Sequence, residues 1–338
     1  MSIVMTGGGT GGHLAIIKAV KEYLKEEELI YIGSTQGQDR QWFEDDSDFK
    51  QTYFLETKGV VNQGALGKVK SLFKIFTSAL EVRKMLKKHH ATVVFSVGGF
   101  SAAPAAIAAK ISGIPLVIHE QNAALGSLNK LLKPYAATFI SSYLEESPVK
   151  AYPIKEIFFE NAHIRHKVKT IIFLGGSQGA KAINTLALSI ASELQKRGIK
   201  IIHQAGVNNI EEVQKAYHDM GIEAEVFGFT TKLAEYMNEA DFAIARAGAS
   251  TLWELCATAL PTLFIPYPYA ASDHQYYNAK FLVEKDLAWL MRENEVAKEK
   301  VLALLDENIE SKSKGLMSIV EKDGSKKIAI LLKRFSNI

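Results

Sequence analysis

The chain has 338 residues, 47% of them hydrophobic, and a formal net charge of +3 at pH 7. That is enough apolar material for one large or two ordinary α/β domains. So small a net charge does not indicate nucleic-acid binding, and the single cysteine, Cys256, excludes a disulfide framework and fits a reducing compartment.

Short β-rich runs alternate with longer helical patterns along the chain, which predicts βαβ units and parallel sheets. The first series of predicted strands covers residues 3–5, 29–33, 93–97, 115–119 and 138–141, and the second covers 170–174, 200–203, 224–227, 242–245 and 262–266. Residues 143–169 break the pattern and form the predicted linker, and a last helix at about 326–335 is expected to cross back to the first domain. We therefore predict two doubly wound, Rossmann-like domains with a ligand cleft at the carboxyl ends of their sheets.

Three predicted strands run into glycine-rich turns that are followed by helices. The turns are at residues 7–12, 98–99 and 175–179. Glycine lets the backbone approach a ligand closely, and the free N–H groups at the start of a helix favour anions. The chain is therefore expected to handle two phosphorylated ligands.

Two of these turns also match motifs of other enzymes. The first satisfies the G-x-G-x-x-G pattern of dinucleotide dehydrogenases, but residues 31–35 lack the acid that should end the second strand. The third matches the G-x-S-x-G turn of hydrolases, for which Asp241 or Asp273 with His274 would be the partners. A serine that receives a phosphate explains the same residues and is the preferred interpretation.

Residues 119–122 read His-Glu-Gln-Asn at the end of a predicted strand. The second histidine of the zinc motif H-E-x-x-H is absent because position 123 is alanine, and no other metal cluster is evident, so no metal site is predicted. Four polar residues in a row are costly at a strand end unless they bind a ligand, although they would also be able to cap the next helix.

Six segments follow one another in the order of a known enzyme family. They are GGGTGGH at 7–13, GGFSAAPA at 98–105, HEQNAALGSLNK at 119–130, GGSQGAKAIN at 175–184, RAGASTLWEL at 246–255 and SDHQYYNA at 272–279. Together they resemble the MurG family, whose members transfer N-acetylglucosamine (GlcNAc) from UDP-GlcNAc to lipid I, the lipid-linked muramyl-pentapeptide of peptidoglycan synthesis, to give lipid II.

The resemblance spans residues 1–290 and implies the GT-B fold, an inverting hexosyltransferase activity, and no metal or other cofactor. It implies an acceptor and membrane-side domain of residues 1–152 with the C-terminal helix at about 326–338, and a donor domain of residues 153–325. The expected partners are UDP-GlcNAc, lipid I and an anionic membrane surface, with no nucleic acid, and the expected location is the cytoplasmic face of the cell membrane, held peripherally.

The same resemblance implies the substrate contacts. Ser177 and Lys155 would contact phosphate, the backbone around Thr230 would meet the uracil, and Glu254 would accept the ribose hydroxyls. The other implied contacts are Asn184, Ala249, Ser250, Thr251, Leu252, Trp253, His274 and Gln275 in the donor domain and Thr10, Gly11, Gly12 and Asn122 in the acceptor domain.

Inverting transfer needs a base that removes a proton from the acceptor hydroxyl. His13 is the first candidate and Glu120 the second, while helix N-termini would stabilise the departing UDP. Three places depart from the family pattern. The proline that usually follows the first-turn histidine is absent, since residues 14–17 read Leu-Ala-Ile-Ile. The usual Asn-Pro-Val-Arg ends in Lys155, which keeps the charge without bidentate geometry, and the second glycine turn carries its hydroxyl at Ser101, shifted by one residue.

Residues 67–90 form a basic amphipathic segment with seven Lys and Arg residues against one acid, Glu81. Such a helix is typical of membrane interfaces, although an ordinary surface helix is the alternative. The predicted lipid contacts are Lys68, Lys70, Leu72, Phe73, Lys74 and Phe76. Two other functions stay open: a UDP-GlcNAc 2-epimerase, against which this segment argues, and a non-catalytic UDP-sugar sensor, against which His13 and the 119–122 run argue.

Overall fold

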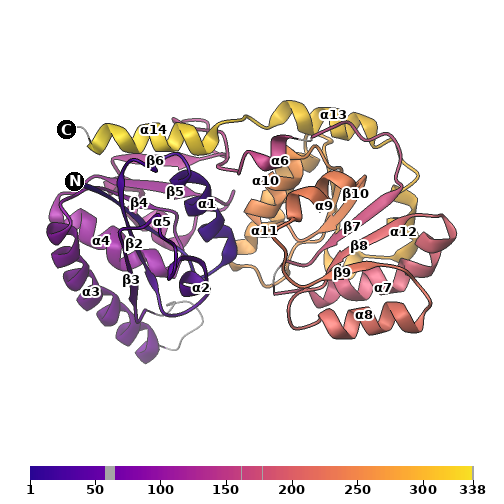
Figure 1. Cartoon of the computed structure of the whole chain (residues 1–338), viewed down its shortest axis with the longest axis horizontal. Helices are drawn as coiled ribbons and strands as arrows, with labels where there is room; N and C mark the ends of the chain where they lie inside the picture. Colours follow the sequence, from indigo (N-terminus) through magenta and orange to yellow (C-terminus); the bar gives the residue numbers. More distant parts are fainter. Residues whose placement is uncertain (58–64, 161, 177, 337–338) are drawn as a thin grey trace. The chain divides into compact units, whose positions relative to one another are not determined.

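The chain folds into two α/β units, seen in the computed structural model of Figure 1, which describes residues 1–57, 65–160, 162–176 and 178–336. Unit 1 is Met1–Ile154 with Asp323–Ile338, and unit 2 is Lys155–Lys322. Each unit contains a six-stranded parallel sheet with helices on its faces. This confirms the predicted class of two Rossmann-like domains. The assignment of acceptor and donor roles to them stays a prediction.

The sheet of unit 1 has the strand order β3-β2-β1-β4-β5-β6. Its strands are β1 (Ser2–Thr6), β2 (Glu28–Ser34), β3 (Gln51–Leu55), β4 (Ala91–Ser96), β5 (Leu116–Glu120) and β6 (Thr138–Ser141). Its helices are α1 (Gly11–Lys21), α2 (Asp39–Phe43), α3 (Ala65–Lys88), α4 (Ala103–Ser112), α5 (Ser127–Leu132) and α14 (Gly324–Ser336).

The sheet of unit 2 has the order β12-β11-β10-β7-β8-β9. Its strands are β7 (Thr170–Leu174), β8 (Lys200–Gln204), β9 (Glu225–Phe227), β10 (Phe242–Ala245), β11 (Thr262–Phe264) and β12 (Trp289–Leu290). Its helices are α6 (Ile157–Glu160), α7 (Lys181–Lys196), α8 (Ile210–Asp219), α9 (Leu233–Glu239), α10 (Ala249–Ala257), α11 (His274–Val283), α12 (Lys298–Leu304) and α13 (Glu310–Ile319), with 3-10 turns η3 (Ala271–Asp273) and η4 (Glu293–Glu295).

Helices cover both faces of each sheet, so the central strands β1 and β7 are buried along their whole length. In β1, Ile3, Val4 and Met5 are buried, and in β7 so are Ile171 and Phe173. The strand order reverses between β1 and β4 in unit 1 and between β7 and β10 in unit 2. Ligands of such sheets bind beside these reversals, and the glycine turns follow these strands.

Helix α14 brings the end of the chain back to unit 1, beside α1 and β4 (Figure 1). The Ser325 hydroxyl donates to the carbonyl of Ile154 at 3.2 Å. A Cβ on Gly324 would lie 2.5 Å from the carbonyl oxygen of Tyr152, so only glycine fits at this position. The start of α14 therefore packs against Tyr152 and Ile154, at the end of the Met1–Ile154 segment of unit 1.

Candidate active site

The first glycine turn lies directly against the second one in unit 1. The N–H of Gly8 donates to the carbonyl of Gly98 at 3.3 Å. A Cβ on Gly99 would lie 2.4 Å from the Gly8 carbonyl oxygen, so no larger residue fits there. The two turns form one surface of main-chain groups at the strand reversal of this sheet.

Helix α1 starts from this surface without a side-chain cap at Thr10. In unit 2, α7 after Ala180 and α10 after Gly248 start in the same way. The first N–H groups of such helices lack intrahelical partners and carry the positive end of the helix dipole. All three helix starts are thus suited to anionic groups.

His13 is held from both sides of its ring. Its Nδ1 lies 2.9 Å from the Thr10 hydroxyl, and its Nε2 lies 2.9 Å from Nε2 of Gln121. The structure therefore brings the first glycine turn and the 119–122 run together around this imidazole. The sequence interpretation did not assign Gln121 a role of its own, although it belongs to the same run.

The Glu120 carboxylate is buried and already accepts several hydrogen bonds. Its Oε1 receives the N–H of Asn122 at 3.0 Å, and its Oε2 receives the N–H of Gly126 and Nδ2 of Asn129, each at 2.9 Å. These contacts fold the segment between β5 and α5. They make Glu120 an organiser of the loop that carries Asn122 and leave its oxygens little capacity to accept a further proton from a substrate.

Two other polar groups near the turns are fully buried. The ring nitrogens of His119 have no hydrogen-bond partner in the described part of the chain, and burial, aided by nearby His13, lowers the pKa of His119 to about 3. The ring is therefore neutral and packs edge-on against Tyr152. The hydroxyl of Ser101, shifted relative to the family pattern, is likewise buried without a hydrogen-bond partner among the described residues.

In unit 2 the expected diphosphate and ribose residues lie on the first turns of α10. Ala249, Leu252 and Trp253 are buried, so only their main chain is available to a ligand, whereas Ser250 and Thr251 are partly exposed. Leu252 already donates its N–H to the Gly248 carbonyl at 2.9 Å. Glu254 is partly exposed one turn further on. Its carboxyl group, however, is surrounded by protein atoms. This burial raises the pKa of Glu254 to about 7, and the charge of Lys155 opposes that rise.

Two other expected donor residues, Asn184 and Thr230, already hydrogen-bond to neighbouring protein groups. The Asn184 amide donates to the Ala205 carbonyl at 3.1 Å and lies 3.0 Å from Nε2 of His203, so it is occupied in the interior. Thr230 accepts the N–H of Lys232 at 3.0 Å and is partly exposed beside β9. Ser177 lies outside the described residues.

His274 and Gln275 stand at the start of α11. Nδ1 of His274 is 2.8 Å from the Ala271 carbonyl, and Oε1 of Gln275 accepts the N–H of Tyr267 at 2.9 Å. Both residues are partly exposed. Gln275 thereby fixes the loop that follows β11 through its amide oxygen.

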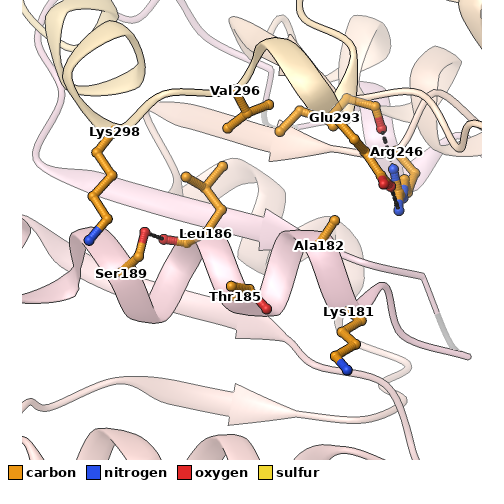
Figure 2. Close-up of a pocket in the computed structure, with 10 residues that line it drawn as sticks. Lys181, Ala182, Thr185, Leu186, Ser189, Arg246, Glu293, Val296 and Lys298 are labelled. Atoms are coloured by element: carbon orange, nitrogen blue, oxygen red, sulfur yellow. Dashed lines mark hydrogen bonds and ion pairs between the residues drawn. The ribbon is translucent and has the colours of Figure 1, made fainter.

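A cavity of about 560 Å³ lies along α7 in unit 2 (Figure 2). Figure 2 shows Lys181 and Lys298 near its two ends and the Arg246–Glu293 ion pair above the start of the helix. Arg246 also donates to the carbonyls of Ile265 and Pro266, each at 3.0 Å. None of the expected substrate residues lines this cavity. Arg246 thus joins the start of the loop after β10 to the end of β11 and to η4. The sequence interpretation did not assign it this role, although Arg246 is the first residue of the fifth family segment.

The hydrolase motif finds no support in the contacts of its candidate acids. Asp241 accepts the N–H groups of Lys169 and Thr170, and Asp273 is paired with Arg292 at 2.7 Å, so neither acid orients His274. Within the described residues no group of three His, Cys, Asp or Glu side chains is placed to hold a metal ion.

The comparisons with known proteins cover both units. Residues 3–141 match the glycosyltransferase family 28 N-terminal domain, and residues 170–331 match the C-terminal domain of the same family. The UDP-N-acetylglucosamine–N-acetylmuramyl-(pentapeptide) pyrophosphoryl-undecaprenol N-acetylglucosamine transferase of Sulfurovum sp. (strain NBC37-1) is 75% identical over 336 residues, which is 99% of each chain. The chain belongs to the MurG family. It is a glycosyltransferase, which confirms the resemblance seen in the six segments.

Solved structures agree with this assignment. The crystal structure of Acinetobacter baumannii MurG has a TM-score of 0.80 and 26% identity, covering 98% of this chain and 99% of that one. A UDP-GlcNAc 2-epimerase from Neisseria meningitidis has a TM-score of 0.62 at 13% identity, a likeness of fold alone. The fold is thus shared with epimerases, while the sequence places this chain among MurG glycosyltransferases.

Proposed function

We propose that this MurG-family chain transfers GlcNAc from UDP-GlcNAc to lipid I (undecaprenyl-pyrophosphoryl-MurNAc-pentapeptide) and so makes lipid II for peptidoglycan synthesis. The observation that carries the proposal is the 75% identity, over nearly the whole of both chains, to a relative named for this reaction. Through peptidoglycan the reaction serves cell shape and cell division.

Unit 2 is the proposed donor unit. The uncapped start of α10 at Ala249–Thr251, with Lys155 and Ser177, would hold the diphosphate, because N–H groups and a lysine both stabilise negative charge. Glu254 would accept the ribose hydroxyls, and the backbone at Thr230 would meet the uracil. Gln275 and His274 would bind the sugar. The same N–H groups and lysine would stabilise the charge that develops on departing UDP.

Unit 1 is the proposed acceptor unit. The paired glycine turns and the start of α1, with Thr10, Gly11 and Gly12, would hold the diphosphate of lipid I. His13 is the proposed general base. Its ring is oriented by Thr10 and Gln121, so one of the two ring nitrogens must give up its present partner before it can take a proton from the acceptor. Asn122 is proposed to contact GlcNAc.

Helix α3 supports a peripheral membrane contact. Its buried residues Ala79, Val82 and Leu86 belong to the core cluster that they form with strand and α4 residues of unit 1, and Ile75 is buried as well. A second apolar group on the same helix is exposed: Leu72 (56%), Phe73 (69%) and Phe76 (53%), beside exposed Lys70 and Lys74. One buried and one exposed apolar face exceed what packing on the sheet requires, and the exposed face with its lysines suits an anionic lipid surface. The side chain of Lys68 lies outside the described residues.

No helix in the part of the chain that the structure describes is both long and apolar enough to cross a bilayer. We place the enzyme peripherally at the cytoplasmic face of the cell membrane, where a lipid-linked acceptor and a soluble sugar nucleotide meet.

The test is a transfer assay with labelled UDP-GlcNAc and a lipid I analogue, with and without EDTA. Appearance of labelled disaccharide-lipid in both conditions is the expected result and would support metal-independent transfer. Conversion of UDP-GlcNAc to its 2-epimer without acceptor would identify an epimerase, and binding of UDP-GlcNAc without turnover would identify a sensor. A transferase that EDTA inactivates would overturn the metal independence alone.

A further inference from the structure

An acidic side chain lies behind the first glycine turn. Asp39, the first residue of α2, is completely buried. Its Oδ2 accepts the N–H of Gly9 at 2.7 Å, and its Oδ1 accepts the N–H of Ser34 at 2.9 Å. One carboxylate therefore joins the turn after β1 to the end of β2.

The hydroxyl of Tyr31 completes this connection. It lies 2.8 Å from the Gly7 carbonyl and 3.1 Å from Oδ1 of Asp39. Tyr31 is itself fully buried against the aromatic rings of Phe43 and Phe49, so its hydroxyl has a fixed position. Burial, followed by the neighbouring Asp39 charge, raises the pKa of Tyr31, so the phenol stays protonated and able to donate.

The glycines of this region are shaped around the carboxylate. A Cβ on Gly8 would lie 2.5 Å from Oδ1 of Asp39, and a Cβ on Gly33 would lie 2.7 Å from the same atom. Gly37, in the turn before α2, has φ +84° and approaches Gly9 so closely that a Cβ would be 2.7 Å from the Gly9 Cα. The turn, the carboxylate and the segment before α2 thus fit one another with no spare room.

We propose that Asp39 is a positioning residue, which holds the first glycine turn in the shape that receives the diphosphate of the acceptor. Asp39 accepts the Gly9 N–H from the buried side of the turn, and this fixes the orientation of the peptide that leads into Thr10 and α1. Ligand-facing N–H groups that are already oriented need no ordering when the anion binds, which is the advantage of preorganisation. Asp39 does not touch the substrate. This role rests on the proposed function.

The test compares Asp39→Asn with two other variants. Asparagine keeps the size but places an amide nitrogen against one of the N–H donors, so the turn loses a charged acceptor. Tyr31→Phe keeps the ring packing and removes only the hydroxyl. Asp46→Asn is the matched control. In the same unit, Asp46 accepts from buried Lys21 at 2.7 Å and from the N–H of Asp48 at 3.1 Å, and within the described residues it forms no hydrogen bond with the first glycine turn. Steady-state kinetics with a lipid I analogue and calorimetry with UDP-GlcNAc are the readouts.

We expect Asp39→Asn to raise KM for the acceptor by about tenfold or more, the usual effect of losing a hydrogen bond to a charged group, with UDP-GlcNAc affinity within about twofold of the parent. Tyr31→Phe should raise the acceptor KM in the same direction by a smaller factor, and it carries the test if Asp39→Asn does not fold. Asp46→Asn should lower the melting temperature without a selective change in acceptor KM.

The outcomes separate this role from the proposed function. A parent protein that binds UDP-GlcNAc but transfers nothing would overturn the function. An active parent whose folded Asp39→Asn variant keeps its acceptor KM would overturn only the role of Asp39, as would an equal rise in acceptor KM in Asp46→Asn. If Asp39→Asn does not fold, an unchanged acceptor KM in Tyr31→Phe would overturn the role of Asp39.

Discussion

Lys155 and Glu254 are electrostatically coupled within unit 2. Burial raises the pKa of the Glu254 carboxyl to about 7, and the Lys155 ammonium pulls it in the opposite direction. The sequence assigns these residues to two different parts of UDP-GlcNAc, the phosphate and the ribose. Their coupling means that the charge state of the proposed ribose contact depends on the proposed phosphate contact.

This coupling predicts a pH dependence of donor binding. Only the ionised carboxylate can accept two ribose hydroxyls, so affinity for UDP-GlcNAc should fall as the pH drops through about 7. If the ionised form alone binds, affinity at pH 6 should be roughly tenfold lower than at pH 8. UDP-GlcNAc is the right ligand because its phosphodiester groups do not titrate in this range. Calorimetry at several pH values measures the effect.

Two variants check the origin of this dependence. Glu254→Gln should bind more weakly at pH 8 and lose the dependence, because its amide does not titrate. Lys155→Gln should move the midpoint to higher pH, because the opposing positive charge is gone. A pH profile of Glu254→Gln that matches the parent would show that another group titrates.

The proposed base predicts a loss of turnover without a loss of donor affinity. His13→Ala should lower kcat by about 10²–10⁴-fold, the usual contribution of a general base, while UDP-GlcNAc binding to unit 2 stays intact. His13→Asn keeps a hydrogen-bonding side chain but cannot take a proton near neutral pH. Activity restored by asparagine would mean that His13 only positions the acceptor.

Glu120 should behave differently from His13. Because its carboxylate accepts the N–H of Asn122 and Gly126 and the Asn129 amide, Glu120→Gln sets an amide nitrogen against those donors. We expect a lower melting temperature together with reduced activity, whereas His13→Ala should leave the melting temperature nearly unchanged. A stable Glu120→Gln variant with a catalytic defect as large as that of His13→Ala would return Glu120 to the role of base.

Local sequence patterns predicted the centre of each sheet well because those strands are apolar runs followed by glycine turns. They missed β3 (Gln51–Leu55) and β12 (Trp289–Leu290). Both are edge strands in which most residues are only partly buried, and β12 has only two residues. An edge strand pairs on one side and is covered less, so its sequence carries a weaker apolar signal.

The motifs also identified residues at the site without revealing how their polar atoms are used. The pattern at 119–122 cannot show that the oxygens of Glu120 are occupied by its own loop, since Gly126 and Asn129 donate from further along the chain. Asp39 was missed for a similar reason. It reaches Gly9 across 30 positions of sequence, and only the pairing of β1 with β2 brings the two together.

The exposed face of α3 predicts salt-sensitive membrane binding. Charge reversal at Lys68, Lys70 and Lys74 should weaken binding to anionic vesicles by about 1 kcal/mol for each lysine that reaches the surface, and added salt should act in the same way. Turnover of a water-soluble acceptor should survive. Vesicle co-sedimentation measures the binding. The matched control reverses three exposed lysines of unit 2, Lys285, Lys298 and Lys300, and should bind like the parent. Equal losses in both triple variants would indicate a general charge effect.

Arg165 predicts a stability requirement behind the donor site. Its buried guanidinium donates to the carbonyls of Ala240 at 3.2 Å, Met237 at 3.1 Å and, at the end of α10, Thr258. Burial lowers the pKa of Arg165 to about 10, so it stays charged at neutral pH and offsets the negative ends of α9 and α10.

Arg165→Met would leave these carbonyls buried without donors, each at a cost of about 1–3 kcal/mol, so we expect unit 2 to lose roughly 3 kcal/mol or more of unfolding free energy. Arg165→Lys should recover part of the loss, because an ammonium supplies fewer donors. Urea unfolding followed by tryptophan fluorescence reports on this unit when Trp42 of unit 1 is replaced by Phe in every variant, because Trp253 and Trp289 both belong to unit 2. The control is Arg197→Met. It removes surface ion pairs to Glu193 and Asp306 and a long hydrogen bond, at 3.4 Å, to the Leu302 carbonyl, and it should cost at most about 1 kcal/mol. Helix α10 carries the proposed diphosphate contacts at its other end, so saturating UDP-GlcNAc should restore stability to Arg165→Met. Equal losses of unfolding free energy in Arg165→Met and Arg197→Met would contradict the role of the buried guanidinium.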